Sequence, residues 1–294
     1  MIYNLTNLSQ QKRSLIEAFV EQLSRINGMS AIVLGGSYAR GTQHEKSDID
    51  IGLYYFPDHP FSIYEIRGIA EGIAIDGSAT VTRFYEWGAW VNGGAWINTS
   101  QGKVDFLYRN LDQVQRTISE ARQGISHHDY DQQPTHGFYS VIYLAEIQYC
   151  IPLYDPKMLI AKLKSLVAVY PPHLKRKVIS DSLWAAEFTL LHARDYAAKG
   201  DIYNTAGCVN RVVSNITQAL FAINEKYFMG DKNLLDTMAK FSSLPSGYIQ
   251  QINRILAHPG STGQMLTKTL RKLEQVWNSV VSLPGVDYKS QFPI

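Results

Sequence analysis

A chain of 294 residues with 45% hydrophobic and 18% charged residues has the composition of a folded globular protein rather than a disordered one. Its formal net charge of +2 provides no broad basic surface of the kind that a large nucleic-acid partner requires. No segment approaches the ~18 apolar residues of a transmembrane helix, no secretory signal is evident, and two cysteines cannot form a disulfide framework. We therefore expect a soluble cytoplasmic protein whose partners include neither membranes nor nucleic acid.

The front third of the chain alternates between helical and strand patterns. Apolar residues at helical spacing predict a helix over 9–27, and the apolar run 30–34 predicts a strand that ends at two glycines. The pattern then indicates the first turn of a helix at 38–43, a second strand at 48–55 and another helix at 61–74.

Two more strand segments are expected before residue 110. Residues 88–98 predict a hairpin, because Asn92-Gly93 supplies the positive φ that a tight turn requires. A turn at Gln101-Gly102 then leads into a strand that carries Asp105. Together these elements predict a mixed sheet of about four or five strands with helices.

Helical patterns dominate after residue 110. Glycine or proline separates most of them, and Asp201 and Asp231, each directly after a glycine, suit helix N-caps. Helices are expected over 111–123, 137–150, 156–168, 173–199, 202–228, 231–241, 246–257 and 262–282. The predicted fold class is α+β, with an N-terminal mixed domain at residues 1–110 and a helical bundle domain at residues 111–294.

Three carboxylates in the front domain carry the predicted chemistry. Asp48 and Asp50 lie two apart on one predicted strand, so both point to the same face. Asp105 can reach that face from a neighbouring strand. Crowded carboxylates repel each other unless a cation lies between them, and Mg²⁺ prefers oxygen ligands while it keeps positions open for substrate phosphates. We expect these acids to be catalytic and to bind two Mg²⁺ ions, with Mn²⁺ as the alternative metal.

A glycine turn precedes the acids. Gly35, Gly36 and Ser37 lie between a strand and a helix, where backbone N–H groups and the serine hydroxyl can approach nucleotide phosphates. Arg40, one turn further, can donate to a terminal phosphate or pair with a nearby carboxylate. The glycine spacing matches that of a P-loop, but Thr42 stands where a P-loop requires lysine, which excludes that class.

These motifs resemble the DNA polymerase β-type nucleotidyltransferase superfamily. Its signature is a strand followed by Gly-Ser, then Asp-x-Asp on the next strand and a third acid on a later strand. The matching segments here are 33–41, 47–51 and 104–106, and the resemblance covers about residues 30–108.

The resemblance implies a role for each of the quoted residues. Asp48 and Asp50 would bind both metals, Asp105 would complete the metal that activates the attacking group, and Gly36 with Ser37 would hold the β- and γ-phosphates. The implied enzyme is a nucleotidyltransferase of the EC 2.7.7 type. It moves a nucleoside monophosphate, in the simplest case AMP from ATP, to a hydroxyl and releases pyrophosphate.

The helical rear resembles the acceptor-binding halves of aminoglycoside and lincosamide nucleotidyltransferases. This resemblance, which is architectural, implies a small hydroxylated acceptor and is compatible with a homodimer. Glu146 and Glu187 lie on apolar helices and are candidates for the general base that takes the acceptor's proton. A salt-bridged or surface acid is the alternative for each.

A second function remains open at this point. A nucleotide-binding regulatory or antitoxin-like module without turnover would carry the same fold. The complete set of three acids argues against a decayed site, so nucleotidyl transfer is the favoured prediction.

Overall fold

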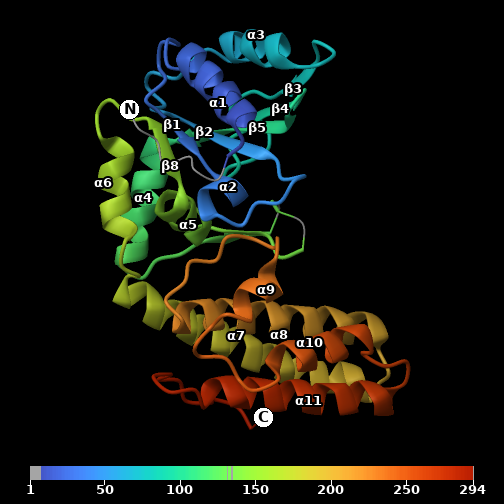
Figure 1. The fold of residues 1–294 in the computed structure, drawn as a ribbon. Coiled ribbons are helices and arrows are strands. Elements are labelled where there is room, and N and C mark those ends of the chain that lie inside the picture. The colour runs from blue at the N-terminus through green and yellow to red at the C-terminus, as the bar shows by residue number, and fades with distance from the viewer. Residues whose placement is uncertain (1–7, 131, 134, 294) are drawn as a thin grey trace. The chain divides into compact units, whose positions relative to one another are not determined.

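The computed structural model of the protein describes residues 8–130, 132–133 and 135–293, and it divides into two compact units (Figure 1). Unit 1 comprises Met1–Glu120 with His127–Val169, and unit 2 comprises Ala121–Ser126 with Tyr170–Ile294.

Within the described residues, unit 1 is built on a six-stranded mixed sheet in the order β3-β4-β5-β2-β1-β8. The neighbours β2 and β5 run parallel, and every other neighbouring pair in this sheet is antiparallel. The strands are β1 (Ala31–Leu34), β2 (Ile49–Tyr55), β3 (Ala79–Val81), β4 (Gly94–Thr99), β5 (Gly102–Asn110) and β8 (Ile151–Tyr154).

Helices α1 (Gln10–Leu23) and α3 (Ile63–Ile73) cover one face of this sheet (Figure 1). Phe19 of α1 meets Phe106 of β5 edge to face, with ring centroids 5.8 Å apart. Ile66 of α3 is fully buried in the same apolar cluster. The alternation of apolar residues along the strands supplies the sheet side of this core, as the period of two requires.

The opposite face of the sheet carries the remaining helices of the unit (Figure 1). A short helix, α2 (Gly36–Arg40), follows β1 directly, and α4 (Leu111–Arg122) follows β5. Helix α5 (Val141–Tyr149) packs against α6 (Leu159–Val167). Lys164 of α6 donates from Nζ to three carbonyl oxygens at the end of α5, at 2.7 to 3.2 Å, which satisfies acceptors that a helix end leaves unpaired.

The predicted hairpin at residues 88–98 is wrong. Only its second half is a strand, β4, which pairs with β3 on one side and β5 on the other. The backbone N–H groups of Trp90 and Val91 donate instead to Oε1 of Gln132, at 2.8 and 3.0 Å. A distant side chain therefore competes successfully for the donors that a hairpin would have used.

Strands β3 and β8 account for the difference between the four or five strands expected and the six observed. The three residues of β3 are too few to show a periodic pattern, and β8 includes Pro152. Proline is tolerated there because β8 is an edge strand. The helix predicted over 137–150 begins at Val141, since β7 (Phe138–Tyr139) pairs with β6 (His128–Asp129).

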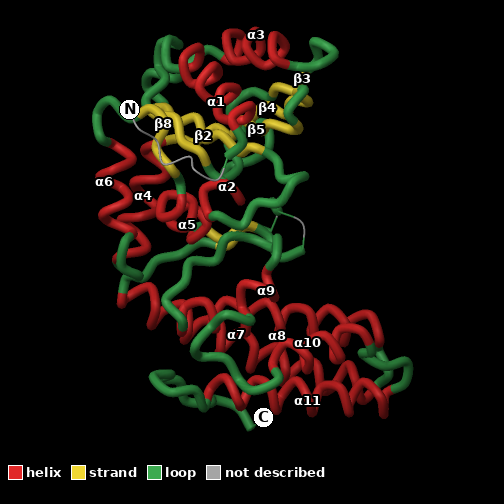
Figure 2. Tube along the Cα trace, in the orientation of Figure 1, coloured by secondary structure: helices red, strands yellow, loops and turns green. Residues whose placement is uncertain are grey.

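Unit 2 is built from helices and the loops that join them, in the part of it that is described (Figure 2). Asp201 caps α8 by accepting from the backbone N–H of Asn204 at 3.0 Å, as predicted, whereas the residue at the N-cap of α9 is Asn233 and not Asp231. Trp277 of α11 donates from Nε1 to the Leu183 carbonyl of α7 at 3.1 Å. The helices are α7 (Pro172–Ala198), α8 (Ile202–Ile223), α9 (Leu234–Met238), α10 (Tyr248–Ala257) and α11 (Gly263–Val281).

The mixed sheet with helices at the front and helices at the rear confirm the predicted α+β class. The two units divide later than residue 110, because α5, α6 and β8 all lie in unit 1. The strand β8 pairs with β1, which ties residues 151–154 to the sheet. Among the described helices, none combines the length and the apolar character needed to cross a bilayer.

Candidate active site

Asp50 and Asp105 are direct neighbours across the only parallel pair of the described six-stranded sheet. Their Cα atoms are partners in the register of β2 with β5. The residues that flank them, such as Ile51 and Phe106, are fully buried in the core beneath α1 and α3. Both aspartates therefore point to the opposite face, where each is half-buried. Neighbouring strands lie ~4.8 Å apart, so the two carboxylates meet on one surface.

The Asp50 carboxylate is seated against the glycine turn. The backbone N–H of Gly35 donates to the Asp50 carbonyl oxygen at 2.8 Å. Gly36 has φ +57°, and a Cβ built on it would lie 1.7 Å from Oδ2 of Asp50. Two independent requirements thus select glycine at position 36: the left-handed backbone and the space that the Asp50 carboxylate occupies.

We predict that Gly36→Ala abolishes whatever chemistry depends on Asp50. Gly77→Ala is the matched control, because Gly77 also has a positive φ, +69°, but nothing lies within 4 Å of its added Cβ. Both variants carry the strain of alanine at positive φ, about 1 kcal/mol. Only Gly36→Ala also displaces the carboxylate. Thermal unfolding and nucleotide binding should separate the two effects; equal nucleotide binding by both variants would contradict the prediction.

The other residues predicted for the site lie near this pair along the chain. Asp48 immediately precedes β2 and is half-buried, and Ser37 is the second residue of α2. Arg40 folds back on its own turn, where Nε donates to the Gly36 carbonyl at 3.3 Å. The phosphate-binding role of Arg40 and the roles of Ser37 and Asp48 stay predictions.

This face has the oxygen donors that a divalent metal prefers, but the described residues do not form a complete set of protein ligands around one position. Among the described residues, no three His, Cys, Asp or Glu side chains gather closely enough to hold an ion. Asp50 and Asp105 supply two neighbouring carboxylates, the donor type that Mg²⁺ prefers. Since Mg²⁺ commonly binds through one or two carboxylates plus substrate phosphates, this pair is a sufficient protein contribution.

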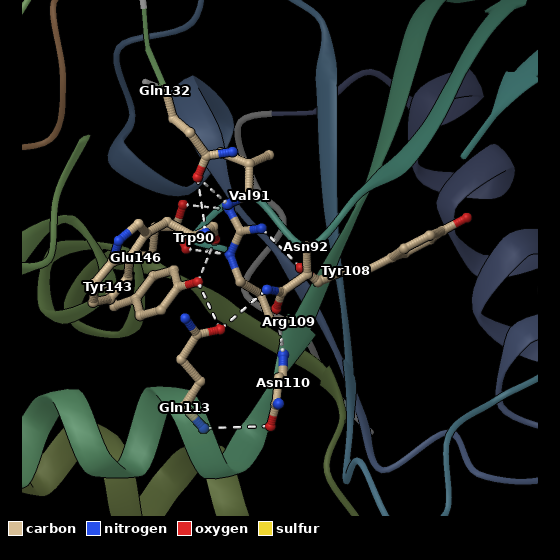
Figure 3. Close-up of polar contacts among 10 residues, drawn as sticks. All are labelled: Trp90, Val91, Asn92, Tyr108, Arg109, Asn110, Gln113, Gln132, Tyr143 and Glu146. Carbon is tan, nitrogen blue, oxygen red and sulfur yellow. Dashed lines mark hydrogen bonds and ion pairs between the residues drawn. The ribbon is translucent and has the colours of Figure 1, made fainter. Parts of the chain in front are cut away.

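Glu146 is a salt-bridged acid. Its two carboxylate oxygens accept from Nε and Nη2 of Arg109, each at 2.7 Å (Figure 3). Arg109 is 5% exposed and also lies over the Tyr143 ring, 5.6 Å from its centroid. Burial alone would lower the pKa of Arg109, but the charge and hydrogen bonds of Glu146 raise it, so the guanidinium stays charged. The structure thus favours the salt-bridged alternative over a general base at position 146.

Glu187 holds the C-terminal segment of unit 2. It is fully buried on α7 and accepts from the hydroxyls of Tyr288 and Ser290. The backbone N–H groups of Gln291 and Phe292 each donate to it at 2.8 Å. Burial opposes ionisation of Glu187, but these hydrogen bonds outweigh burial and lower its pKa. A carboxylate with four donors and a lowered pKa is a structural anchor rather than a base that awaits a proton.

Glu187→Gln is expected to lower the Tm of the protein at pH 7. Because the pKa of Glu187 is lowered in the folded state, its stabilisation is present above the ordinary value of 4.5 and is lost as the pH falls through the folded pKa. The Tm difference between wild type and variant should therefore shrink below about pH 4.5. Scanning calorimetry between pH 3 and 7 measures it; a difference that stays constant with pH would contradict the assignment.

Trp96 completes the row of side chains and was not predicted as a site residue. It is the register partner of Asp105 on β4, as Thr99 is of Gly102. The signal was available in part, because a tight turn at Gln101-Gly102 sets the antiparallel register on either side of it. The erroneous hairpin at 88–98 concealed it by assigning Trp96 to a different pairing.

Comparison with known proteins identifies the class. Residues 16–84 match the family described as a nucleotidyltransferase domain. The matched stretch contains Gly36, Asp48 and Asp50 and ends before Asp105. Over these residues the chain is similar to nucleotidyltransferase domains, in agreement with the resemblance that its motifs predict. Nucleotidyl transfer is the chemistry that this match supports, and it supports a transferase.

The chain was also compared with solved structures and with curated proteins. A nucleotidyltransferase-like protein from Exiguobacterium sibiricum 255-15, solved at 1.90 Å resolution, is 10% identical to this chain. The likeness covers 92% of this chain and 76% of that one, with a TM-score of 0.46. No curated protein matches the chain significantly.

Proposed function

We propose that this protein is a metal-dependent nucleotidyltransferase that transfers AMP from ATP to a hydroxyl group of a small molecule. The observation that carries the proposal is the pairing of Asp50 with Asp105 in register, with the Asp50 carboxylate seated against Gly36. This arrangement joins a carboxylate pair to a backbone turn that is open to phosphate. Nucleotidyl transfer requires both parts side by side.

In this proposal, separate residues of unit 1 bind the triphosphate and the metal. The backbone at Gly36 and the hydroxyl of Ser37 hold the β- and γ-phosphates. Arg40 reaches a terminal phosphate by exchanging its bond to the Gly36 carbonyl for one to the nucleotide. Asp50 and Asp105 would hold Mg²⁺, with Asp48 as a further predicted ligand, and the bound ion would neutralise charge on the entering and leaving oxygens.

The bond changes balance without any further reactant. The acceptor's hydroxyl oxygen forms a bond to the α-phosphorus as the bond from that phosphorus to the pyrophosphate oxygen breaks. The hydroxyl proton leaves to Asp105 or to solvent, and pyrophosphate departs on the side of Gly36. The acceptor is a small hydroxylated molecule because the net charge of +2 provides no surface for a polynucleotide.

A pyrophosphate-release screen tests the proposal. Each of the four common ribonucleoside triphosphates is combined with Mg²⁺ and a panel of hydroxyl-bearing metabolites and antibiotics. We expect release with ATP and at least one acceptor, a loss of about 100-fold or more in EDTA, and recovery with Mg²⁺ or Mn²⁺. Calorimetry that detects no nucleotide binding in the presence of Mg²⁺ would refute the proposal. Binding without release under any pairing would instead support a regulatory module.

A further inference from the structure

A stacked pair of indole rings lies beside the carboxylates. The ring centroids of Trp87 and Trp96 are 4.0 Å apart and the planes differ by 15°. Trp96 is the register partner of Asp105, and residues paired across antiparallel strands point to the same face. Its ring lies along the strand over Gly94, where an added Cβ would be 3.3 Å from Cη2. Trp87 remains 49% exposed, so the pair presents an indole surface next to Asp105.

The segment that carries Trp87 is held by Gln132, far away in the sequence. The Gln132 side chain donates from Nε2 to the Trp87 carbonyl. Its Oε1 accepts from the backbone N–H groups of Trp90 and Val91 (Figure 3). Gln132 is buried, at 9% exposure. Its amide thus satisfies three backbone groups of a loop that forms no strand.

A second set of buried polar contacts fixes the other end of this loop. Asn92 is 0% exposed; its Nδ2 donates to Gln113 at 3.0 Å and its Oδ1 accepts from the Asn110 N–H at 2.9 Å (Figure 3). The hydroxyl of Tyr85 accepts from Nδ2 of Asn110 at 2.5 Å, and the backbone at Tyr85 has φ +60°. Buried networks with these contacts satisfied hold one geometry. An exposed aromatic side chain on a loop that is braced at both ends suits a preorganised binding surface.

The order of groups across the sheet indicates which substrate the exposed indole surface of Trp87 and Trp96 would contact. The row runs from Gly36 through Asp50 and Asp105 to Trp96. In an in-line displacement the entering and leaving oxygens lie on opposite sides of the phosphorus. Since pyrophosphate is held at the Gly36 end, the attacking hydroxyl enters from the Trp96 end.

We propose that Trp87, backed by Trp96, is the acceptor subsite, and that the acceptor carries a ring that stacks on the exposed indole. The chemical class is a hydroxylated compound with an aromatic ring. This inference rests on the proposed function, since it takes the direction of attack from it.

Indole N–H signals in a ¹H–¹⁵N correlation spectrum test the subsite without turnover. The chain has five tryptophans, and Trp87→Phe identifies the Trp87 signal. Phenyl β-D-glucoside and methyl β-D-glucoside are the probes, because they share sugar hydroxyls and differ in the aromatic ring. In the presence of Mg²⁺ and a non-hydrolysable ATP analogue, we expect the phenyl compound to shift the Trp87 and Trp96 signals. Its affinity should fall about tenfold or more in Trp87→Ala and persist in Trp87→Phe.

Two controls make the outcome decisive. Trp184 of unit 2, 39% exposed and stacked on the Phe188 ring, is the matched control: an exposed indole backed by a second aromatic ring. Unchanged Trp87 signals, equal shifts with the methyl compound, or equal shifts at Trp184 would overturn the subsite. ATP that shifts Trp87 when inorganic triphosphate does not would place the base there and overturn the acceptor assignment. Indole shifts as expected, combined with no pyrophosphate release from any acceptor, would instead count against the proposed function alone.

Discussion

Asp105→Asn is expected to lower the rate of nucleotidyl transfer by about 10³-fold, equivalent to about 4 kcal/mol of lost transition-state stabilisation. The reason is geometric: Asp105 and Asp50 are register partners on one face, so each supplies one of the two neighbouring carboxylates of the proposed metal site. Asp50→Asn should have an effect of similar size. The double variant should be little worse than either single one, because residues that act as a unit are not additive.

The folded state should survive these changes. Bound Mg²⁺ would offset the repulsion between the two neighbouring carboxylates. Added Mg²⁺ should therefore raise the Tm of the wild type, while the Tm of Asp105→Asn should not respond to it. Asp58→Asn is the control, since Asp58 is an exposed residue in the turn after β2. Retention of a tenth or more of wild-type transfer by Asp105→Asn would exclude Asp105 from the site.

The second large effect is on stability. Glu146→Gln is expected to reduce the free energy of unfolding by about 3 kcal/mol, because it leaves the buried Arg109 guanidinium without its counter-ion. The Arg109 side chain is only 6% exposed and that of Glu146 is 27% exposed, so water replaces the lost charge poorly. Urea denaturation at pH 7 measures the loss.

Two comparisons assign this effect to the buried pair. Asp181→Asn removes one partner of an exposed pair with Lys177, in which both side chains are 56% exposed, and should cost less than about 1 kcal/mol. Replacing both Arg109 and Glu146 with leucine should recover much of the lost stability, since apolar substitutes avoid burying a lone charge. If Glu146→Gln instead kept full stability and lost transfer, the general-base prediction for Glu146 would be right.

Local information in the chain was enough for most of the elements. Helical spacing predicted each of the long helices of unit 2, and apolar runs located β1 and β2, because these patterns depend on residues a few positions apart. The Gly-Gly-Ser turn and the later Asp-x-Asp motif stood out from the same local pattern. Where the prediction failed, at residues 88–98, the decisive partner was Gln132, about forty residues away. No local pattern encodes that competition for backbone donors.

The candidate site likewise has a part that local sequence predicted and a part that only the tertiary structure determined. Residue types and spacing by themselves selected Asp48, Asp50 and Asp105 and the glycine turn, since the need for neighbouring anions and an open backbone is chemical. Only the tertiary structure put Asp50 and Asp105 in register, added Trp96 to their row, and gave Glu146 and Glu187 partners that bind them as anchors. The reason is that strand register and the partners of a buried charge are set by pairing and packing between segments distant in sequence.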